Sequence, residues 1–410
     1  MKKVNFITLA FVMLPILSIY RSFISVLSIA DVIILSIAIF SLIDSFINKS
    51  PKRYLMVNEK KYINYVPIIF MIFLIFTTLL AILVNGEVVL SSVIIRIVRY
   101  TLFMYSVSVL GYRYFDSNYG AKLIVSISTV ATVYIFIQTI VFYSMGIVMP
   151  FIIPFLEPMV SDYNDISGLI GWYNQFYYRP QSFFMEPAHF SQYNLVSLAL
   201  CLFWKEKFFE QNRIKTAIFL SIGLVLSTSS IGVLIGLFIW FVYLLKFYSN
   251  KITHKKVMLF ILLCFILIIF SPAIFDIERI TVPVLRVFQT TARTTDSFSL
   301  FEGLNIKHKI LGIGLGNEEA YLGIGSRIPF MNALTIVLLS AGYLGLMAYL
   351  LLSMSMIVYK KGLSRLLGIS LFILSFGSEV FFTYTGIVWM LFIYYWNLEY
   401  IINAKTYTCK

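Results

Sequence analysis

The chain has 410 residues, of which 60% are hydrophobic, 17% aromatic and only 12% charged. A soluble globular protein carries about 25% charged residues, so this chain cannot cover itself with a solvated surface. The formal charge of +13 does not indicate nucleic-acid binding, because the basic residues lie in short clusters between apolar runs. Such clusters are typical of the cytoplasmic loops of membrane proteins. The composition predicts an integral membrane protein that binds no nucleic acid.

The apolar runs predict a polytopic membrane protein, because a span needs about 20 apolar residues. We expect an all-α fold of about twelve transmembrane helices in a single integral membrane domain, residues 1–410. In chain order, the predicted spans are residues 4–20, 23–47, 62–84, 88–110, 122–144, 189–204, 216–228, 231–245, 257–275, 331–359, 366–381 and 386–402. The first is read as a membrane helix and not as a cleaved signal, because no small-x-small cleavage site follows it.

The Lys and Arg residues predict the orientation of these spans. With the N-terminus inside, 22 of the 32 basic residues fall in cytoplasmic segments, 8 fall outside, and Arg96 and Arg99 lie within a span. Both termini are therefore predicted to be cytoplasmic. Two external segments are long, residues 145–188 and 276–330. In a protein with so little soluble mass, these two loops are where chemistry is expected.

The end of the first long loop, "YYRPQSFFMEPAHFSQYN", gathers charge in an otherwise apolar chain. Pro187 suits the first turn of a helix, which places Glu186 at or next to the N-cap and His189 on the same helix face. Arg179 precedes this helix and could fold back to the same point. Two interpretations are open: Glu186 caps the helix while Arg179 reaches lipid headgroups, or the three residues form a functional site at membrane depth.

The second long loop contains a glycine-rich stretch, "KILGIGLGN", at residues 309–317. It follows the basic residues Arg293, Lys307 and His308. A glycine-rich loop beside such residues could bring its backbone N–H groups to a phosphate. The alternative is a flexible surface loop. It is not a Walker A motif, because the Lys-Ser/Thr ending is missing.

Arg96 and Arg99 lie three residues apart on one face of the fourth predicted span. Unpaired arginines are costly in lipid, so either they face a polar cavity, which we favour, or this span begins deeper than predicted. Asp31 and Glu379, also within predicted spans, are candidates either as their partners or for packing. The sequence has no Cys/His metal spacing, no H-E-x-x-H motif and no nucleophile elbow, so no metal is expected. The three cysteines, Cys201, Cys264 and Cys409, suggest no disulfide framework.

Three stretches resemble the Wzy-type O-antigen and capsular polysaccharide polymerases, which share a superfamily with the O-antigen ligases. "RPQSFFMEPAHF" (179–190) is similar to their R-x-x-S/G-x-F-x-E-P motif, and "KILGIGLGN" to their P-h-h-G-h-G-h-G-N stretch. "NALTIVLLSAGYLGL" (332–346) looks like their next helix. One departure is visible: relatives often carry His-Pro before the glycines, whereas this chain has Lys309-Ile310, with His308 one place earlier.

The resemblance implies a metal-independent, cofactor-independent glycosyltransferase in the bacterial cytoplasmic membrane. Its substrates would be polyprenyl-diphosphate-linked oligosaccharides, joined into a surface polysaccharide on the outer face. A chain-length regulator and a flippase would be candidate partners beside membrane lipid. The residues then expected to act are Glu186 and His189 on the acceptor, Arg179, Arg293, Arg96 and Arg99 on the diphosphate, and His308, Gly312, Gly314 and Asn317 in the second loop. The alternatives are a ligase-like transfer to a lipid or protein acceptor, and a polysaccharide flippase or other transporter.

Overall fold

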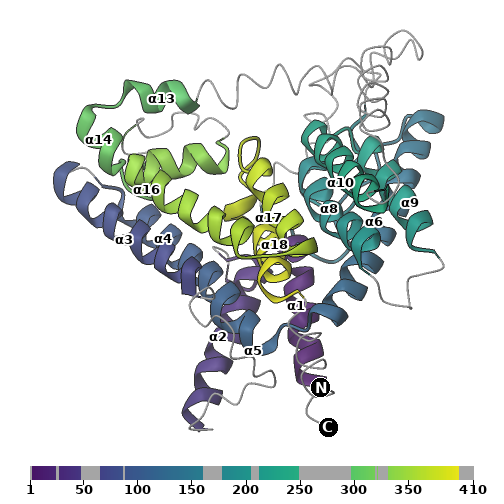
Figure 1. Ribbon diagram of the computed structural model, residues 1–410, viewed down its shortest axis with the longest axis horizontal. Coiled ribbons are helices and arrows are strands. Elements are labelled where there is room, and N and C mark those ends of the chain that lie inside the picture. The colour runs from purple at the N-terminus through teal and green to yellow at the C-terminus, as the bar shows by residue number, and fades with distance from the viewer. Residues whose placement is uncertain are drawn as a thin grey trace. The chain divides into compact units, whose positions relative to one another are not determined.

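A computed structural model of the chain describes residues 2–24, 27–47, 65–85, 88–159, 178–204, 212–248, 297–318, 321 and 331–396 (Figure 1). The regular elements of this part are helices, apart from an isolated bridge between Arg21 and Ser28. Five helices of this part are long and apolar enough to cross a membrane: Ile29–Ile47, Val66–Val84, Leu90–Tyr114, Ser117–Met145 and Ala333–Val358. The fold is therefore all-helical with several potential membrane spans, and the number of twelve stays a prediction.

The chain divides into two compact units, one formed by Met1–Leu123 with Thr291–Lys410 and the other by Ile124–Thr290. The second unit contains most of α6 (Ser117–Met145), together with α8 (Pro187–Phe203), α9 (Arg213–Leu226) and α10 (Ser230–Tyr248). Most side chains of α8 are buried, which makes it the central helix of this unit. Its contacts with α6 are partly polar: Ser197 Oγ lies 2.7 Å from Ser128 Oγ and donates to the Ile124 carbonyl at 3.1 Å.

The first unit combines the N-terminal helices with those that follow the second long loop. Its elements are α1 (Lys2–Leu17), α2 (Ile29–Ile47), α3 (Val66–Asn85), α4 (Leu90–Tyr105), η2 (Ser106–Leu110), α5 (Gly111–Tyr114), α13 (Ser297–Gly303), α14 (Ile306–Leu311), α16 (Ala333–Val358), α17 (Gly362–Leu374), η6 (Val380–Phe382) and α18 (Tyr384–Tyr395). Helices α3, α14 and α17 all pack on α16. Phe301 of α13 and Leu304, which follows that helix, are buried against Leu338 and Leu339 of α16.

Helix α16 is broken at Gly342, where φ is +62° and ψ is −157°. A break in a helix frees the carbonyls of the preceding turn, which need other donors. The segment before α16 supplies them: Ile313 N–H donates to the Leu339 carbonyl at 2.8 Å and Gly314 N–H to the Ser340 carbonyl at 3.1 Å. At the break, the carbonyls of α16 are therefore hydrogen-bonded by the backbone of the glycine-rich stretch.

Most predicted spans coincide with helices, but several boundaries were wrong. The second span was predicted from residue 23, whereas α2 begins at Ile29 after a turn. The two C-terminal spans are shorter than predicted, since α17 has 13 residues and α18 has 12. Glu379 was placed inside a span, yet it lies between α17 and η6 as the N-cap of the latter. The predicted span at 257–275 lies outside the described residues.

Candidate functional site

Glu186 is the N-cap residue of α8, and Pro187 opens the helix, as the sequence predicts. The backbone of Glu186 is extended, with φ −143° and ψ 156°, and its side chain makes no capping hydrogen bond. The simple capping interpretation of Glu186 is therefore wrong. Its carboxylate is half-buried at the positive end of a helix, where negative charge is favoured. His189, also half-buried, follows one turn later on α8.

The segment before Glu186 is held against α6 by Gln138. The Gln138 side chain brackets the Ser182 backbone, accepting from its N–H at 2.9 Å and donating to its carbonyl at 3.5 Å. Ser182 Oγ also donates to the Ala131 carbonyl at 3.0 Å. Ser182 has φ +57°, a left-handed conformation that glycine adopts without strain.

These contacts place the motif well below the end of α6. Gln138 precedes the last residue of α6, Met145, by 7 residues and Ala131 precedes it by 14. At about 1.5 Å per residue, Ser182 lies roughly 10–20 Å back along the helix axis from that end. The final part of the first long loop therefore runs back beside α6.

Arg179 is brought to the turn between α9 and α10. Its Nε donates to Thr228 Oγ1 at 3.3 Å. The next residue in that turn, Ser229, accepts a 2.8 Å hydrogen bond from Ser191 in the first turns of α8. Arg179 and Ser191 of α8 thus contact adjacent residues of one turn, while the approach of Arg179 to Glu186 and His189 stays a prediction. Thr228 has φ +55°, a second left-handed residue with a side chain.

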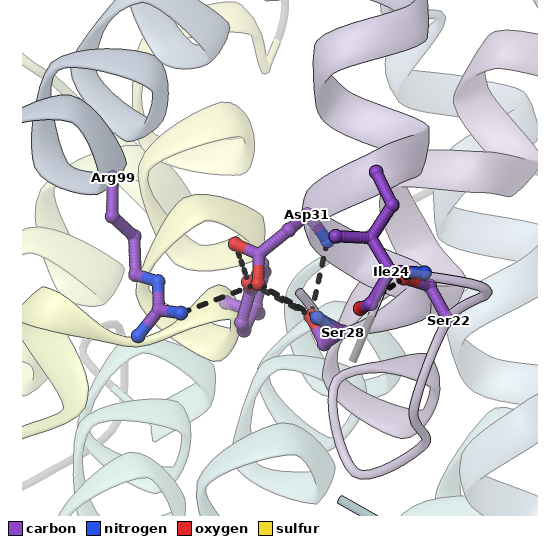
Figure 2. A network of polar contacts seen from close by, with 6 residues as sticks. Ser22, Ile24, Ser28, Asp31 and Arg99 are labelled. Carbon is purple, nitrogen blue, oxygen red and sulfur yellow. Dashed lines mark hydrogen bonds and ion pairs between the residues drawn. The ribbon is translucent and has the colours of Figure 1, made fainter. Parts of the chain in front are cut away.

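In the first unit, Arg99 of α4 forms an ion pair with Asp31 in the first turn of α2, at 3.4 Å (Figure 2). Asp31 also accepts hydrogen bonds from the N–H and hydroxyl of Ser28, at 3.0 and 2.9 Å, and from the Tyr384 hydroxyl at the start of α18. The Asp31 N–H donates back to Ser28 Oγ at 3.1 Å. The network joins three elements that are distant in sequence, and it confirms Asp31 as a partner of one arginine.

Arg96 pairs with Glu318 at 3.0 Å, and that carboxylate is 2% exposed. Glu318 comes directly after the glycine-rich stretch, so the ion pair ties the second long loop to α4. The sequence offered Asp31 and Glu379 as partners and missed Glu318. Because both arginines face carboxylates, their charge is largely compensated within the first unit.

The glycine-rich stretch is neither a phosphate nest nor a flexible surface loop. Five of the six N–H groups in residues 312–317 already donate within the protein: Gly312 to His308, Ile313 to Leu339, Gly314 to Ser340, Leu315 to Thr78 and Asn317 to Gly314. Residues 312–317 are all buried. Both predicted alternatives for this segment were therefore wrong. The segment instead links α3, α4 and α16 through its hydrogen bonds.

Gly312 and Gly314 have φ of +80° and +95°, and a Cβ on Gly312 would lie 2.3 Å from the Ser340 backbone. Asn317 is fully buried; its side-chain carbonyl accepts from Val89 N–H at 3.2 Å and its amide donates to the Ile313 carbonyl at 3.1 Å. These candidates from the second loop therefore have structural contacts.

His308 lies in α14, where its ring Nδ1 is 2.7 Å from the Tyr321 hydroxyl. Burial, and to a lesser extent Lys307, lowers the pKa of His308. The imidazole is therefore neutral near pH 7, and Nδ1 can accept from the tyrosine. Tyr321 is 40% exposed, so it is the outer member of the pair.

The predicted site residues are divided between the two units. Glu186, His189 and Arg179 lie in the second unit, whereas Arg96, Arg99, His308, Gly312, Gly314 and Asn317 lie in the first. Arg293 lies outside the described residues. Among the described residues, no group of three His, Cys, Asp or Glu side chains could hold a metal ion. Cys201 is a buried free thiol in α8.

Comparison with protein-family models gives no match for the chain, and comparison with curated proteins gives none either. The likeness to the Wzy-type polymerases therefore rests on the three sequence motifs.

Proposed function

We propose that the protein is a polysaccharide polymerase that joins polyprenyl-diphosphate-linked oligosaccharide repeat units at the outer face of the bacterial cytoplasmic membrane. In this reaction a hydroxyl of the acceptor sugar attacks the anomeric carbon of the growing chain. The bond between that carbon and the diphosphate breaks, and polyprenyl diphosphate leaves with the electron pair. The hydroxyl proton passes to a base on the protein.

One observation carries the proposal: the Glu186 carboxylate is positioned by a helix start but is not used to cap it. Within the described residues, no hydrogen bond or ion pair occupies this carboxylate. A half-buried acid at such a place is available to orient or deprotonate a substrate hydroxyl. His189 on the next turn is the second candidate for that role.

The depth of the motif also favours a lipid-linked substrate. Ser182 lies roughly 10–20 Å back along α6, whereas the headgroup layer is only about 5–8 Å deep in a bilayer about 40–45 Å thick with a hydrocarbon core of about 30 Å. The motif beside α6 therefore runs past the level of the headgroups. The diphosphate of a polyprenyl lipid sits at that level, because its hydrocarbon tail stays in the membrane. Arg179, at the same turn as the start of α8, is the candidate that binds the diphosphate and stabilises its charge as it leaves.

Arg96 and Arg99 have a weaker claim on the diphosphate. Each faces a carboxylate at 3.0 or 3.4 Å, so an anion would first have to displace Glu318 or Asp31. We assign these arginines to the stability of the first unit, and leave diphosphate binding to Arg179 and, in the second long loop, Arg293.

The test uses purified full-length protein in lipid nanodiscs with polyprenyl-diphosphate-linked repeat units. A ladder of products on a gel, with release of polyprenyl diphosphate, is expected. A single transfer to a lipid or peptide acceptor would indicate a ligase. Movement of the lipid-linked unit across vesicles without new glycosidic bonds would indicate a flippase, and either result would overturn the polymerase proposal.

The residue test compares Glu186→Gln with Glu157→Gln. Glutamine nearly preserves the size of the side chain but removes its charge and basicity. Loss of a catalytic carboxylate lowers the rate by about a hundredfold or more, whereas Glu157, an exposed carboxylate in the same loop, should tolerate the change. Rates are normalised to correctly inserted protein. Near wild-type polymerisation by Glu186→Gln would return Glu186 to a structural role.

A further inference from the structure

The part of the first long loop that directly follows α6 is an apolar segment that folds back along the helix. Residues 146–156, "GIVMPFIIPFL", contain no polar side chain. The segment begins at Gly146, whose N–H closes the end of α6 on the Phe142 carbonyl. An external loop of eleven residues without a polar side chain is unusual on a surface that faces water.

The direction of the segment follows from one hydrogen bond. The hydroxyl of Tyr134 donates to the Pro150 carbonyl at 2.6 Å. Tyr134 lies 11 residues before the end of α6, which is about 16 Å back along the axis. Helical side chains lean toward the N-terminus of their helix, so Pro150 lies about 10 Å or more below the helix end. Five residues of extended chain span up to about 17 Å, so the segment descends almost directly.

The depth reached is that of the boundary between headgroups and hydrocarbon. The 29 residues of α6 are about 44 Å long, close to the full thickness of a bilayer with its headgroups. The hydrocarbon core is about 30 Å thick, so the inner edge of the headgroup layer lies about 5–8 Å below this end and the segment passes just beyond it. The segment is not helical, so its backbone polar groups need water or headgroups nearby, which excludes the centre of the hydrocarbon. Apolar side chains at the boundary can still reach into the acyl chains.

The tip of the segment presents an aromatic side chain at a strained position. The Leu156 N–H bonds to the Ile153 carbonyl across a turn at Pro154 and Phe155. Phe155 has φ +72° and is fully exposed. A bulky residue in this conformation is a rare and costly choice, and glycine is the residue usually found there. Phe155 therefore gains nothing from the protein interior in return for this strain.

Neighbouring apolar side chains extend the same surface. Ile147 is 54% exposed, and Ile140 and Met145 on the last turns of α6 are 63% and 69% exposed. This surface is continuous with that of a helix long and apolar enough to cross the membrane. Within residues 146–156, the Phe151 side chain is buried and fixes the segment to the second unit.

We infer that residues 146–156 form a re-entrant interfacial segment whose exposed side chains, Phe155 and Ile147 foremost, insert into the acyl chains of the adjacent leaflet. Its partner is the lipid surface itself. The segment is attached to the functional motif through Tyr134, whose ring stacks on Phe183 at a centroid distance of 5.5 Å. Insertion would therefore hold the motif at a constant depth in the bilayer. The inference does not depend on the proposed polymerase activity.

The test measures the surroundings of single spin labels on protein in nanodiscs. The three native cysteines are replaced by alanine, and new cysteines are placed singly at Phe155 and Ile147. Phe76→Cys, near the middle of α3 and 55% exposed, serves as the lipid reference, and Lys361→Cys, in the turn between α16 and α17, as the water reference. Collision with oxygen reports lipid, and collision with a water-soluble nickel chelate reports water.

Labels at Phe155 and Ile147 should collide more with oxygen than with the nickel chelate, as at Phe76. A pattern like that of Lys361 would show a water-exposed loop and overturn the inference. Protection from both reagents would show that protein covers the segment, which would overturn it as well. If the cysteine-free protein folds poorly, Phe155→Trp in the native background gives a second measurement: quenching of its added fluorescence by lipids brominated on the acyl chain. Absence of added quenching would also contradict insertion.

Discussion

In the first unit, the described residues with left-handed backbone are glycines, whereas in the second unit Phe155, Ser182 and Thr228 hold this conformation with side chains attached. The glycines at 312, 316 and 342 are needed because a Cβ would meet neighbouring backbone within 3 Å. The three side-chain-bearing residues each cost about 1 kcal/mol or more in strain. Strained positions of this kind gather at functional sites, because the side chain is retained for what it contacts.

The two units also treat their carboxylates differently. Asp31 and Glu318 are almost fully buried and each faces an arginine. Glu186 is half-buried at a helix start, and no described group binds it. The comparison suggests that substitutions in the first unit change stability, whereas substitutions around α8 change turnover. Four measurements can break or sharpen this division.

The largest effect is expected for Gly312→Ala. A Cβ there would lie 2.3 Å from the backbone of Ser340, and φ is +80°. The junction with α16 would have to open, at a cost of about 3 kcal/mol or more in unfolding free energy. Thermal unfolding in detergent measures the loss. Gly303→Ala is the control, since nothing lies within 4 Å of its added Cβ. Wild-type stability of Gly312→Ala would contradict the close approach.

Asp31→Asn should destabilise the first unit by about 2 kcal/mol. The change leaves the Arg99 charge without its carboxylate, and the cost stays below that of a fully buried pair because Arg99 is 35% exposed. Adding Arg99→Gln should recover part of the loss in a double-mutant cycle. Strictly additive effects of the two substitutions would show that the ion pair contributes nothing.

Arg179→Lys should lower turnover about tenfold with stability unchanged. Lysine keeps the charge but loses the planar fork that binds a diphosphate with two parallel hydrogen bonds. Product ladders per inserted protein provide the measurement, with Arg21→Lys as the control at another arginine. Equal turnover in wild type and Arg179→Lys would assign Arg179 to its contact with Thr228 alone.

The smallest effect concerns pH. The lowered pKa of His308 means that the folded protein binds its proton less tightly than the unfolded chain does. The stability that His308 contributes is therefore complete above pH of about 6.5 and is lost as pH falls through the folded pKa. Unfolding temperatures measured from pH 7.5 down to 5 should fall more steeply for the wild type than for His308→Gln. Parallel curves would show that protonation of His308 is not linked to folding.

The sequence predicted the helices well where apolar runs were long, because burial in lipid leaves few alternatives to a helix. It also predicted the helix start at Pro187, where proline and a charged residue coincide. It could not predict the Arg96–Glu318 pair, since that contact depends on how a loop more than 200 residues later packs on α4. The glycine-rich stretch was misread because composition does not tell whether N–H groups face a ligand or a broken helix.

The junction at Gly342 has a consequence for how the chain is made. The donors that complete the break, Ile313 and Gly314, and the helices that receive this stretch, α3 and α4, all leave the ribosome before α16. Synthesis proceeds from the N-terminus, so the glycine-rich stretch can pack on α3 and α4 before α16 is made. The order of residues along the chain thus matches an order of assembly in which α16 is never exposed to lipid with its broken turn unpaired.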